Sequence, residues 1–329
     1  MKSARESGVN KFLDKRPGSF YNSFPWLEGS RPRDCPRRDR ASSHHIWRGA
    51  TNASPWVVES AGFWKGWCGV KFVEPKVFLV GETQIIGEGL QAYLDHVGVP
   101  KWTTDAPSDA EKLCEVMGRL CYRSFEPGLN PNVTRVREGN APYLRNIVNV
   151  GHGSVLEHGL LNFIFADVSR VVTHELVRHR AGTAISQESL RFVRLESLSA
   201  YVPVHIRENE EGMEIFARTL EQMEDLQRSL AALYAIDEEK HFAEKKKLTS
   251  AFRRMAPIGL ATTIGWSCNF RTLRHVIEHR TDPHAEEEIR VLFSKVFEIV
   301  RARMPNLFGD YEVEMVDGLP WVKTAHGKI

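Results

Sequence analysis

Residues 174–194 read H-E-L-V-R-H-R-A-G-T-A-I-S-Q-E-S-L-R-F-V-R, a stretch that sets arginines beside short polar side chains. The stretch contains no lysine, and its two glutamates flank the basic part. A guanidinium group presents a planar set of donors that suits phosphate and carboxylate groups. A solvated basic helix end would normally include lysines, so the pattern favours a pocket for an anionic ligand. Five potential cations lie within 17 residues: Arg178, His179, Arg180, Arg191 and Arg194.

Two further stretches place polar side chains beside predicted strands. G-H-G-S-V-L-E-H at 151–158 comes directly before an apolar strand expected at 160–166. N-F-R-T-L-R-H-V-I-E-H-R-T-D-P-H-A at 269–285 follows a strand expected at 261–268. Asn269 is placed to cap a helix over 270–279, because an Asn side chain accepts a hydrogen bond from a free N–H in the first turn.

The three stretches together resemble the flavin-dependent thymidylate synthases over about residues 73–305. That family carries R-H-R followed by S-x-R, preceded by H-x-[ST]-x-x-E-H. It then has an arginine four residues before a proline, N-x-R after a strand, and R-x-[DS]-x-H-A. Arg253 precedes Pro257 here, and the other motifs match at the quoted positions. Eight residues separate R-H-R from S-x-R in this chain, where the family has seven.

The resemblance implies an α+β fold, with a mostly antiparallel sheet flanked by long helices. It implies methylation of deoxyuridylate (dUMP) to thymidylate (dTMP), with 5,10-methylenetetrahydrofolate as carbon donor and NADPH-reduced FAD as hydride source. It also implies a cytoplasmic homotetramer whose sites are built from several subunits. Such a reaction needs no protein nucleophile, because the cofactor carries the hydride. No cysteine lies within the arginine-rich stretch 174–194, and Cys268 falls on an apolar strand that predicts a core thiol.

The resemblance also assigns site residues. Arg280 is expected at the uracil edge, where a guanidinium group favours the N3-deprotonated ring, and Arg280 and Ser189 are the expected catalytic pair. Many members have Gln where this chain has Glu175, and Asn where it has His275. The residues expected at dUMP are Glu175, Arg178, Gln187, Ser189, Leu190, Arg191, Arg253 and Arg280. Those expected at FAD are Ser154, Arg178, His179, Arg180, Gln187, Asn269, Arg271 and His275.

Hydrophobic periodicity predicts the remaining elements. Ser108 and Glu111 predict a capping box at the start of one helix. No strong signal follows residue 306. Strands are expected at 73–80, 160–166 and 261–268, an extended segment at 192–204, and helices at 85–97, from 109, 140–150, 169–180, 213–236, 242–255, 270–279 and 284–303.

Composition excludes several classes of protein. The sequence contains no run of eighteen apolar residues, which a membrane helix would need. It also has no apolar segment near Met1 of the kind that marks a secretory signal. The five cysteines form no C-x-x-C pair and the thirteen histidines no H-E-x-x-H, so we expect reduced thiols and no metal site. His275, His279 and His284 are explained as well by a helix with polar edges.

Charge is unevenly distributed between two expected parts of the chain. Residues 1–69 hold twelve Lys and Arg against six Asp and Glu, a net +6, and residues 70–329 hold 32 against 36, a net −4. The acidic balance of the second part argues against a nucleic-acid surface. Two alternatives stay open: a flavin- and folate-dependent RNA uracil methylase, and a non-catalytic protein that binds phosphate or nucleic acid.

Residues 1–69 form no periodic pattern, although they hold five of the eight tryptophans. A disordered arm, a transit peptide and a segment outside the mature protein are the possible interpretations. The catalytic domain is expected at 70–329, with translation in the source cell beginning at Val70.

We therefore expect a protein that begins at residue 70 to assemble, bind FAD and turn over like the full chain, because every matched motif lies downstream. Purification and flavin absorbance check this prediction, and intact mass of the native protein shows whether the segment exists. If the shortened protein fails to fold or to bind FAD, residues 1–69 have a structural role and the prediction is wrong.

Overall fold

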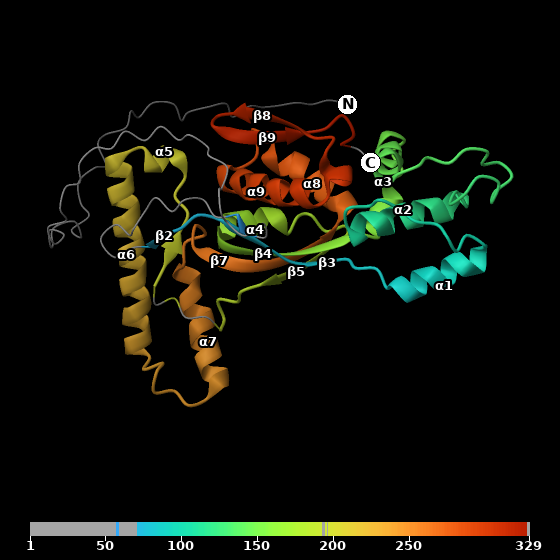
Figure 1. The fold of residues 1–329 in the computed structure, drawn as a ribbon. Helices are drawn as coiled ribbons and strands as arrows, with labels where there is room; N and C mark the ends of the chain where they lie inside the picture. The colour runs from blue at the N-terminus through green and yellow to red at the C-terminus, as the bar shows by residue number, and fades with distance from the viewer. Residues whose placement is uncertain (1–56, 59–70, 193–194, 196, 328–329) are drawn as a thin grey trace, which may run out of the picture. The chain divides into compact units, whose positions relative to one another are not determined.

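The computed structural model describes residues 57–58, 71–192, 195 and 197–327 (Figure 1). Every described residue belongs to one compact unit within residues 47–329. The expectation for residues 1–69 therefore lies outside the described residues, except for the short strand β1 (Val57–Val58). This strand pairs antiparallel with β3 (Lys76–Glu82).

The described residues form a five-stranded sheet in the order β1-β3-β4-β7-β5. Its long strands are β4 (Leu160–Ser169) and β7 (Ala261–Asn269), and β5 (Thr183–Gln187) lies at the edge next to β7. Every neighbouring pair in this sheet is antiparallel. The expected antiparallel α+β architecture is confirmed.

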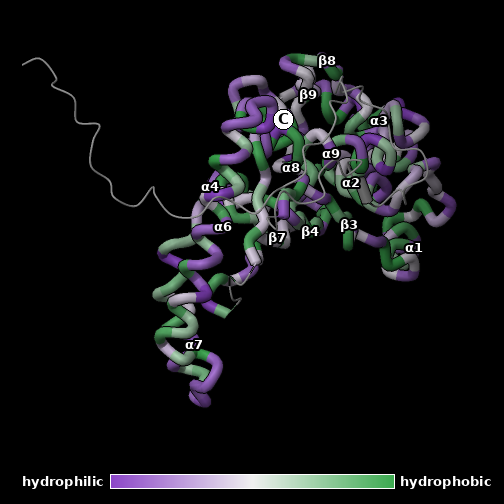
Figure 2. Tube along the Cα trace, turned by 90° about the vertical axis from the view of Figure 1, so that its left-hand side faces the viewer, coloured by the Kyte–Doolittle hydropathy of each residue, from purple (hydrophilic) through white to green (hydrophobic). Residues whose placement is uncertain are grey.

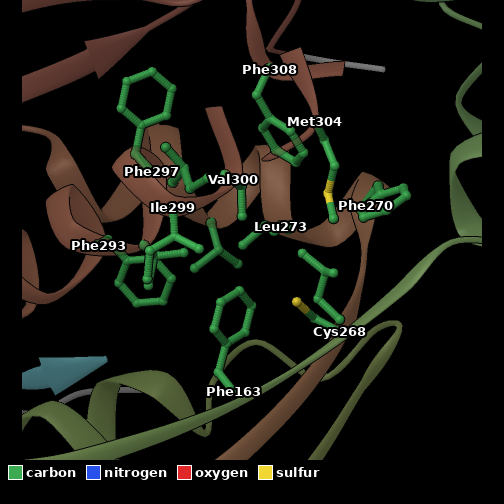
Figure 3. Packing of buried hydrophobic residues seen from close by; sticks show 14 of the residues in the cluster. Phe163, Cys268, Phe270, Leu273, Phe293, Phe297, Ile299, Val300, Met304 and Phe308 are labelled. Carbon is green, nitrogen blue, oxygen red and sulfur yellow. The ribbon is translucent and has the colours of Figure 1, made fainter. Parts of the chain in front are cut away.

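Two helices, α8 (Phe270–Thr281) and α9 (Glu287–Arg303), cover one face of this sheet (Figure 1). The inward side chains of β4 and β7 alternate with exposed or half-buried ones, as a strand with one covered face requires. Figure 3 shows Cys268 at the sheet end of this core, among Phe163, Phe270 and Leu273. The expected core thiol is confirmed, since Cys268 is fully buried.

A group of helices precedes the first long strand. Ser108 caps α2 (Asp109–Tyr122) by accepting from the backbone N–H of Glu111. The Glu111 carboxylate does not accept from the backbone N–H of Ser108, as a capping box would require. It accepts from the Ser108 hydroxyl at 2.9 Å and from the N–H of Asn306 at 2.8 Å, which ties α2 to the C-terminal region. The other helices here are α1 (Gly87–Val97) and α3 (Asn140–Asn149).

A second apolar cluster forms beside the sheet. It packs α6 (Glu210–Leu233) against the strand pair β2 (Lys71–Phe72) and β6 (Ser199–Ala200). The helix α7 (Phe242–Phe252) contacts α6 through a hydrogen bond from Gln227 to the Phe252 carbonyl. Figure 2 shows hydrophilic and hydrophobic residues mixed along α7. The cluster is built from Phe72, Leu190, Leu198, Ala200, Val202, Met213, Ala217, Leu220 and Leu260.

Several expected boundaries are wrong. The helix expected at 169–180 is α4 (Arg170–Leu176), so R-H-R lies in the turn after it. The polar segment after R-H-R contains a strand, β5, because its backbone pairs with β7. The strand expected at 73–80 is displaced to β3, and α9 begins three residues later than expected.

The segment after residue 306, for which the sequence showed no strong signal, also has regular structure. The helix α10 (Pro305–Phe308) leads into a hairpin of β8 (Glu312–Val316) and β9 (Leu319–Lys323). Asp317 and Gly318 turn the hairpin with positive φ, and Asp-Gly is the residue pair that a type I′ turn prefers. The remaining short helices are η1 (Gly153–Glu157), α5 (Val204–Arg207) and η2 (Arg253–Met255). No helix within the described ranges is long and apolar enough to cross a membrane.

Gly182 holds the turn after R-H-R against the start of α8. Its φ is +66°, and a Cβ atom there would lie 2.3 Å from Nδ2 of Asn269 and 2.7 Å from Oγ1 of Thr272. The backbone N–H of Asn269 donates to the Gly182 carbonyl at 3.0 Å. Only a residue without a side chain permits this approach.

We expect Gly182→Ala to lower the free energy of unfolding by about 2–4 kcal/mol, because it adds a steric clash to the left-handed backbone strain. Gly98→Ala is the matched control: its φ is +85°, but nothing lies within 4 Å of the added atom. Urea unfolding of both variants checks the difference. Equal losses would mean that the close approach at Gly182 contributes nothing.

Candidate active site

The three polar stretches meet at one end of the sheet. The first residue of β4, Leu160, pairs with the last of β7, Asn269, and the first of β5, Thr183, pairs with Cys268. The turns before β4 and β5 and the start of α8 therefore share this end. We call it the histidine end, and it comprises Ser154, Glu175, Arg178, His179, Arg180, Asn269, Arg271, His275 and Arg280.

Hydrogen bonds join the three stretches there. Arg271 on α8 donates to the Glu157 carboxylate of η1 at 2.5 Å. The Thr272 hydroxyl donates to the Ala181 carbonyl at 2.7 Å. Asn269 caps α8 as expected, with its Oδ1 accepting from the N–H of Thr272 at 2.8 Å. The exposed Ser154 hydroxyl lies in η1, beside the same group.

Arg280, in the last turn of α8, makes the most contacts in this group. Its Nε donates to Nε2 of His179 at 2.8 Å, and its Nη1 donates to Oε2 of Glu175 at 2.6 Å. Its Nη2 donates to the backbone carbonyl of Glu175 at 3.2 Å. Both side chains of the ion pair are mostly buried, with 19% and 31% exposed.

His179 accepts a hydrogen bond from a cation, so its ring is neutral with the proton on Nδ1. Burial, the Arg280 guanidinium, and then His275 and His279, lower the pKa of His179 to about 4. Burial also lowers the pKa of His275, whose ring lies edge-on to those of His179 and His279. The histidine end therefore gains its positive charge from arginines at neutral pH.

The other expected nucleotide residues lie at the opposite end of β7. The N–H of Glu188 donates to the Thr263 carbonyl, six residues along the strand from the contact between Asn269 and Gly182. At about 3.3 Å per residue, the two ends are about 20 Å apart. We call this second group the serine end: Arg170, Ser189, Leu190, Arg191 and Arg253. Ser189, Leu190 and Arg191 therefore lie at the end of β7 that is remote from Asn269 and the turn at Gly182.

At the serine end, Ser189 organises the turn after β5. Its hydroxyl accepts from the N–H of Arg191 at 3.3 Å, and its carbonyl accepts from the N–H of Phe192 at 3.0 Å. Leu190 is buried in the second apolar cluster, so it anchors the turn. Arg191 is thereby left exposed beside a serine hydroxyl.

Arg170 is a cation of this end that the sequence analysis missed. Its Nη2 donates to the Glu188 carbonyl at 3.3 Å, while its buried Nε has no partner. Burial and the neighbouring Arg253 lower the pKa of Arg170. The only sequence signal was an arginine directly after the capping serine of α4, a position common in ordinary helices.

Gln187, the last residue of β5, pairs with Ile264 and lies next to the serine end. Its amide donates to the hydroxyl of Thr173 on α4 at 3.1 Å. This bond holds the side chain against α4.

Four arginines of the two ends have guanidinium groups that form no hydrogen bond or ion pair within the part of the chain that the structure describes: Arg178, Arg180, Arg191 and Arg253. Arginines with a structural role are paired. Arg119 binds Glu115 at 2.7 Å, and Arg274 binds Asp310 at 2.6 Å. Guanidinium groups without a partner in the protein are available to an anionic ligand.

A cavity of about 450 Å³ opens next to Arg253, between α6 and α7. Gln227, Ala231 and Phe252 are among the residues that line it. Among the described residues, no three His, Cys, Asp or Glu side chains are grouped to hold a metal ion. His284 instead contacts Asp282 at 2.8 Å.

Comparison with known proteins relates this arrangement to one family. A family profile described as thymidylate synthase complementing protein matches residues 104–306. A flavin-dependent thymidylate synthase from Corynebacterium glutamicum is 36% identical over 223 residues, which are 66% of this chain and 86% of the relative. The Mycobacterium tuberculosis enzyme of the same name is 34% identical over 246 residues, 73% of this chain and 95% of the relative.

A solved structure shares the fold at lower identity. The UMP/dUMP methylase PolB from Streptomyces cacaoi, bound with 5-Br UMP, superposes with a TM-score of 0.51 at 14% identity, covering 73% of this chain and 95% of that chain. The family profile includes the three polar stretches, and the sequence matches extend over most of each relative. The chain belongs to the flavin-dependent thymidylate synthase family.

Proposed function

We propose that this protein methylates dUMP to dTMP, with 5,10-methylenetetrahydrofolate as the carbon donor. The observation that carries the proposal is the set of unpaired arginines, which occupy the positions that the family resemblance assigns to nucleotide and flavin. The family membership supports the reaction class, and the names of the relatives support the flavin dependence.

The serine end is suited to the nucleotide phosphate. Ser189 offers a hydroxyl, the turn offers backbone N–H groups, and Arg191 and Arg253 offer two unpaired guanidinium groups. Arg170 adds positive charge behind them. Such charge-assisted bonds to a phosphate dianion are about twice as strong as neutral ones.

Arg280 is suited to the uracil edge. A guanidinium group beside the ring stabilises the anion that forms when N3 loses its proton, and this raises the nucleophilicity of C5. Because His179 stays neutral, it holds Arg280 without adding a second charge that would repel it.

The residues of the histidine end fit FAD. The cofactor carries a pyrophosphate, and Arg178 and Arg180 are exposed cations without a carboxylate partner. The amide of Asn269 lies against Gly182, where a side chain would fill the space. Ser154, His179, Arg271, His275 and Gln187 would complete the set that holds it. When bound and reduced by NADPH, FAD supplies the hydride for the methylation.

We further propose that the reaction uses no cysteine nucleophile. Burial raises the pKa of the Cys268 thiol well above its usual range, and it raises that of Cys114 to about 12. A thiol must ionise to attack a carbon atom, and both of these remain protonated. Cys121 is exposed but lies on α2, outside both ends.

The separation of the two ends supports a site shared between chains. Along β7, the turn at Ser189 lies about 20 Å from Asn269 and the start of α8 in the same chain. We propose a homotetramer in which the serine end of one chain faces the histidine end of another. The RNA-methylase and the non-catalytic alternatives have no observation here that favours them.

The reaction is tested directly by release of tritium from C5-labelled dUMP. With FAD, NADPH and methylenetetrahydrofolate we expect release coupled to dTMP formation, because methylation replaces the hydrogen on C5. UMP and uracil-containing RNA, labelled in the same way, serve as competing substrates. Absence of release from dUMP under these conditions would contradict the proposal.

Substitution of single arginines separates binding from catalysis. Arg280→Ala should lower kcat by about 10²–10³-fold, as loss of a transition-state donor does. Arg191→Ala and Arg253→Ala should instead weaken dUMP binding by about 1.5–3 kcal/mol each, the typical value of a charged hydrogen bond. Steady-state kinetics and equilibrium binding of dUMP distinguish the two patterns, and the reverse result would exchange the assigned roles.

A further inference from the structure

The guanidinium group of Arg280 is held at three of its five N–H groups. Nε binds His179, Nη1 binds the Glu175 carboxylate and Nη2 binds the Glu175 backbone carbonyl. One N–H on each Nη remains. Arg280 therefore keeps two donors for a ligand, while its orientation is set by the protein.

Glu175 supplies two of these three contacts from a fixed position. It lies in the last turn of α4, and its carbonyl also accepts from the backbone N–H of Arg178 at 3.2 Å. Carbonyls at the end of a helix lack partners within the helix and carry partial negative charge. The Glu175 carbonyl and carboxylate thus bind two nitrogens of one planar group, which restricts its rotation.

The charge of Glu175 argues against a direct contact with the reacting base. Deprotonation of N3 places negative charge on the uracil ring, and a carboxylate touching the ring would oppose it. Through Arg280, the same carboxylate has a useful effect, because it holds the cation in place. A glutamine at this position would accept a hydrogen bond from Arg280 without forming an ion pair.

We propose that Glu175 is a positioning residue that acts through Arg280 and not as a contact of the nucleotide. The inference rests on the proposed function, which places Arg280 at the uracil edge. It replaces the expectation that Glu175 binds dUMP itself.

Kinetics of the FAD-loaded enzyme test this proposal. Glu175→Ala should lower kcat by about 10–100-fold, a weaker form of the loss expected for Arg280→Ala. Its dissociation constant for dUMP, from equilibrium dialysis, should stay within about threefold of wild type. Glu175→Gln should recover most of kcat, because its amide oxygen still accepts from Arg280. His174→Ala, on the same helix and exposed, is the matched control and should keep wild-type values.

A double-mutant cycle gives the decisive comparison. In an Arg280→Ala background, Glu175→Ala should change single-turnover tritium release by less than about twofold, since its only route of action is gone. An equal loss in both backgrounds overturns the proposal. Weaker dUMP binding by more than about tenfold with kcat unchanged also overturns it, because that pattern belongs to a substrate contact.

A chemical probe separates this inference from the reaction. Phenylglyoxal modification of Arg280, followed by peptide mass spectrometry of the nucleotide-free holoenzyme, requires no turnover. We expect modification several-fold faster in Glu175→Ala than in wild type, with FAD content unchanged. Equal rates refute the positioning role even if dUMP is methylated. Faster modification without methylation leaves the positioning role standing and refutes the proposed function.

Discussion

The antiparallel pairing of β7 on both of its edges is the constraint on which the site depends. β4 and β5 run in the same direction on either side of β7, so both begin where β7 ends. A shift by one residue would turn the buried side chains of β7 to the opposite face. The register that packs Trp266 and Cys268 into the core therefore also aligns the turns that carry Ser154, the R-H-R residues and Asn269.

Arg274 and the arginines of the two ends differ in their partners. Arg274 is almost fully buried, and its ion pair with Asp310 and the contact of its guanidinium group with Tyr311 join α8 to the C-terminal segment. Arg178, Arg180, Arg191 and Arg253 have no such partners. Arg280 differs from both groups, because three of its N–H groups are hydrogen-bonded within the protein and two remain for a ligand. A cation that must act on a bound base at a defined angle needs both properties.

The sequence predicted the sheet class, the principal helices and the capping by Ser108 and Asn269, because those features depend on local periodicity and on single polar side chains. It did not predict β5. The residues of β5 are short and polar, and their backbone is extended because β7 offers it hydrogen bonds, a partner that lies about 80 residues away. The hairpin after residue 306 carried a signal in Asp317-Gly318, but both strands are short and β8 is mostly exposed. Which motif residues share an end of the sheet depends on register and cannot be read from order along the chain. Arg170 was missed because its neighbours in space, Glu188 and Arg253, are distant from it in sequence.

The length of β7 has a genetic consequence. In the homotetramer proposed above, the serine end of one chain faces the histidine end of another, so a lesion at either end would damage a site that another molecule completes. Two defective alleles, one altered at Arg191 and the other at Arg280, would then complement each other when both are expressed in one cell. In a mixed assembly, some sites join the intact serine end of one product to the intact histidine end of the other. Dominance and recessiveness of such alleles would follow from the geometry of a single strand.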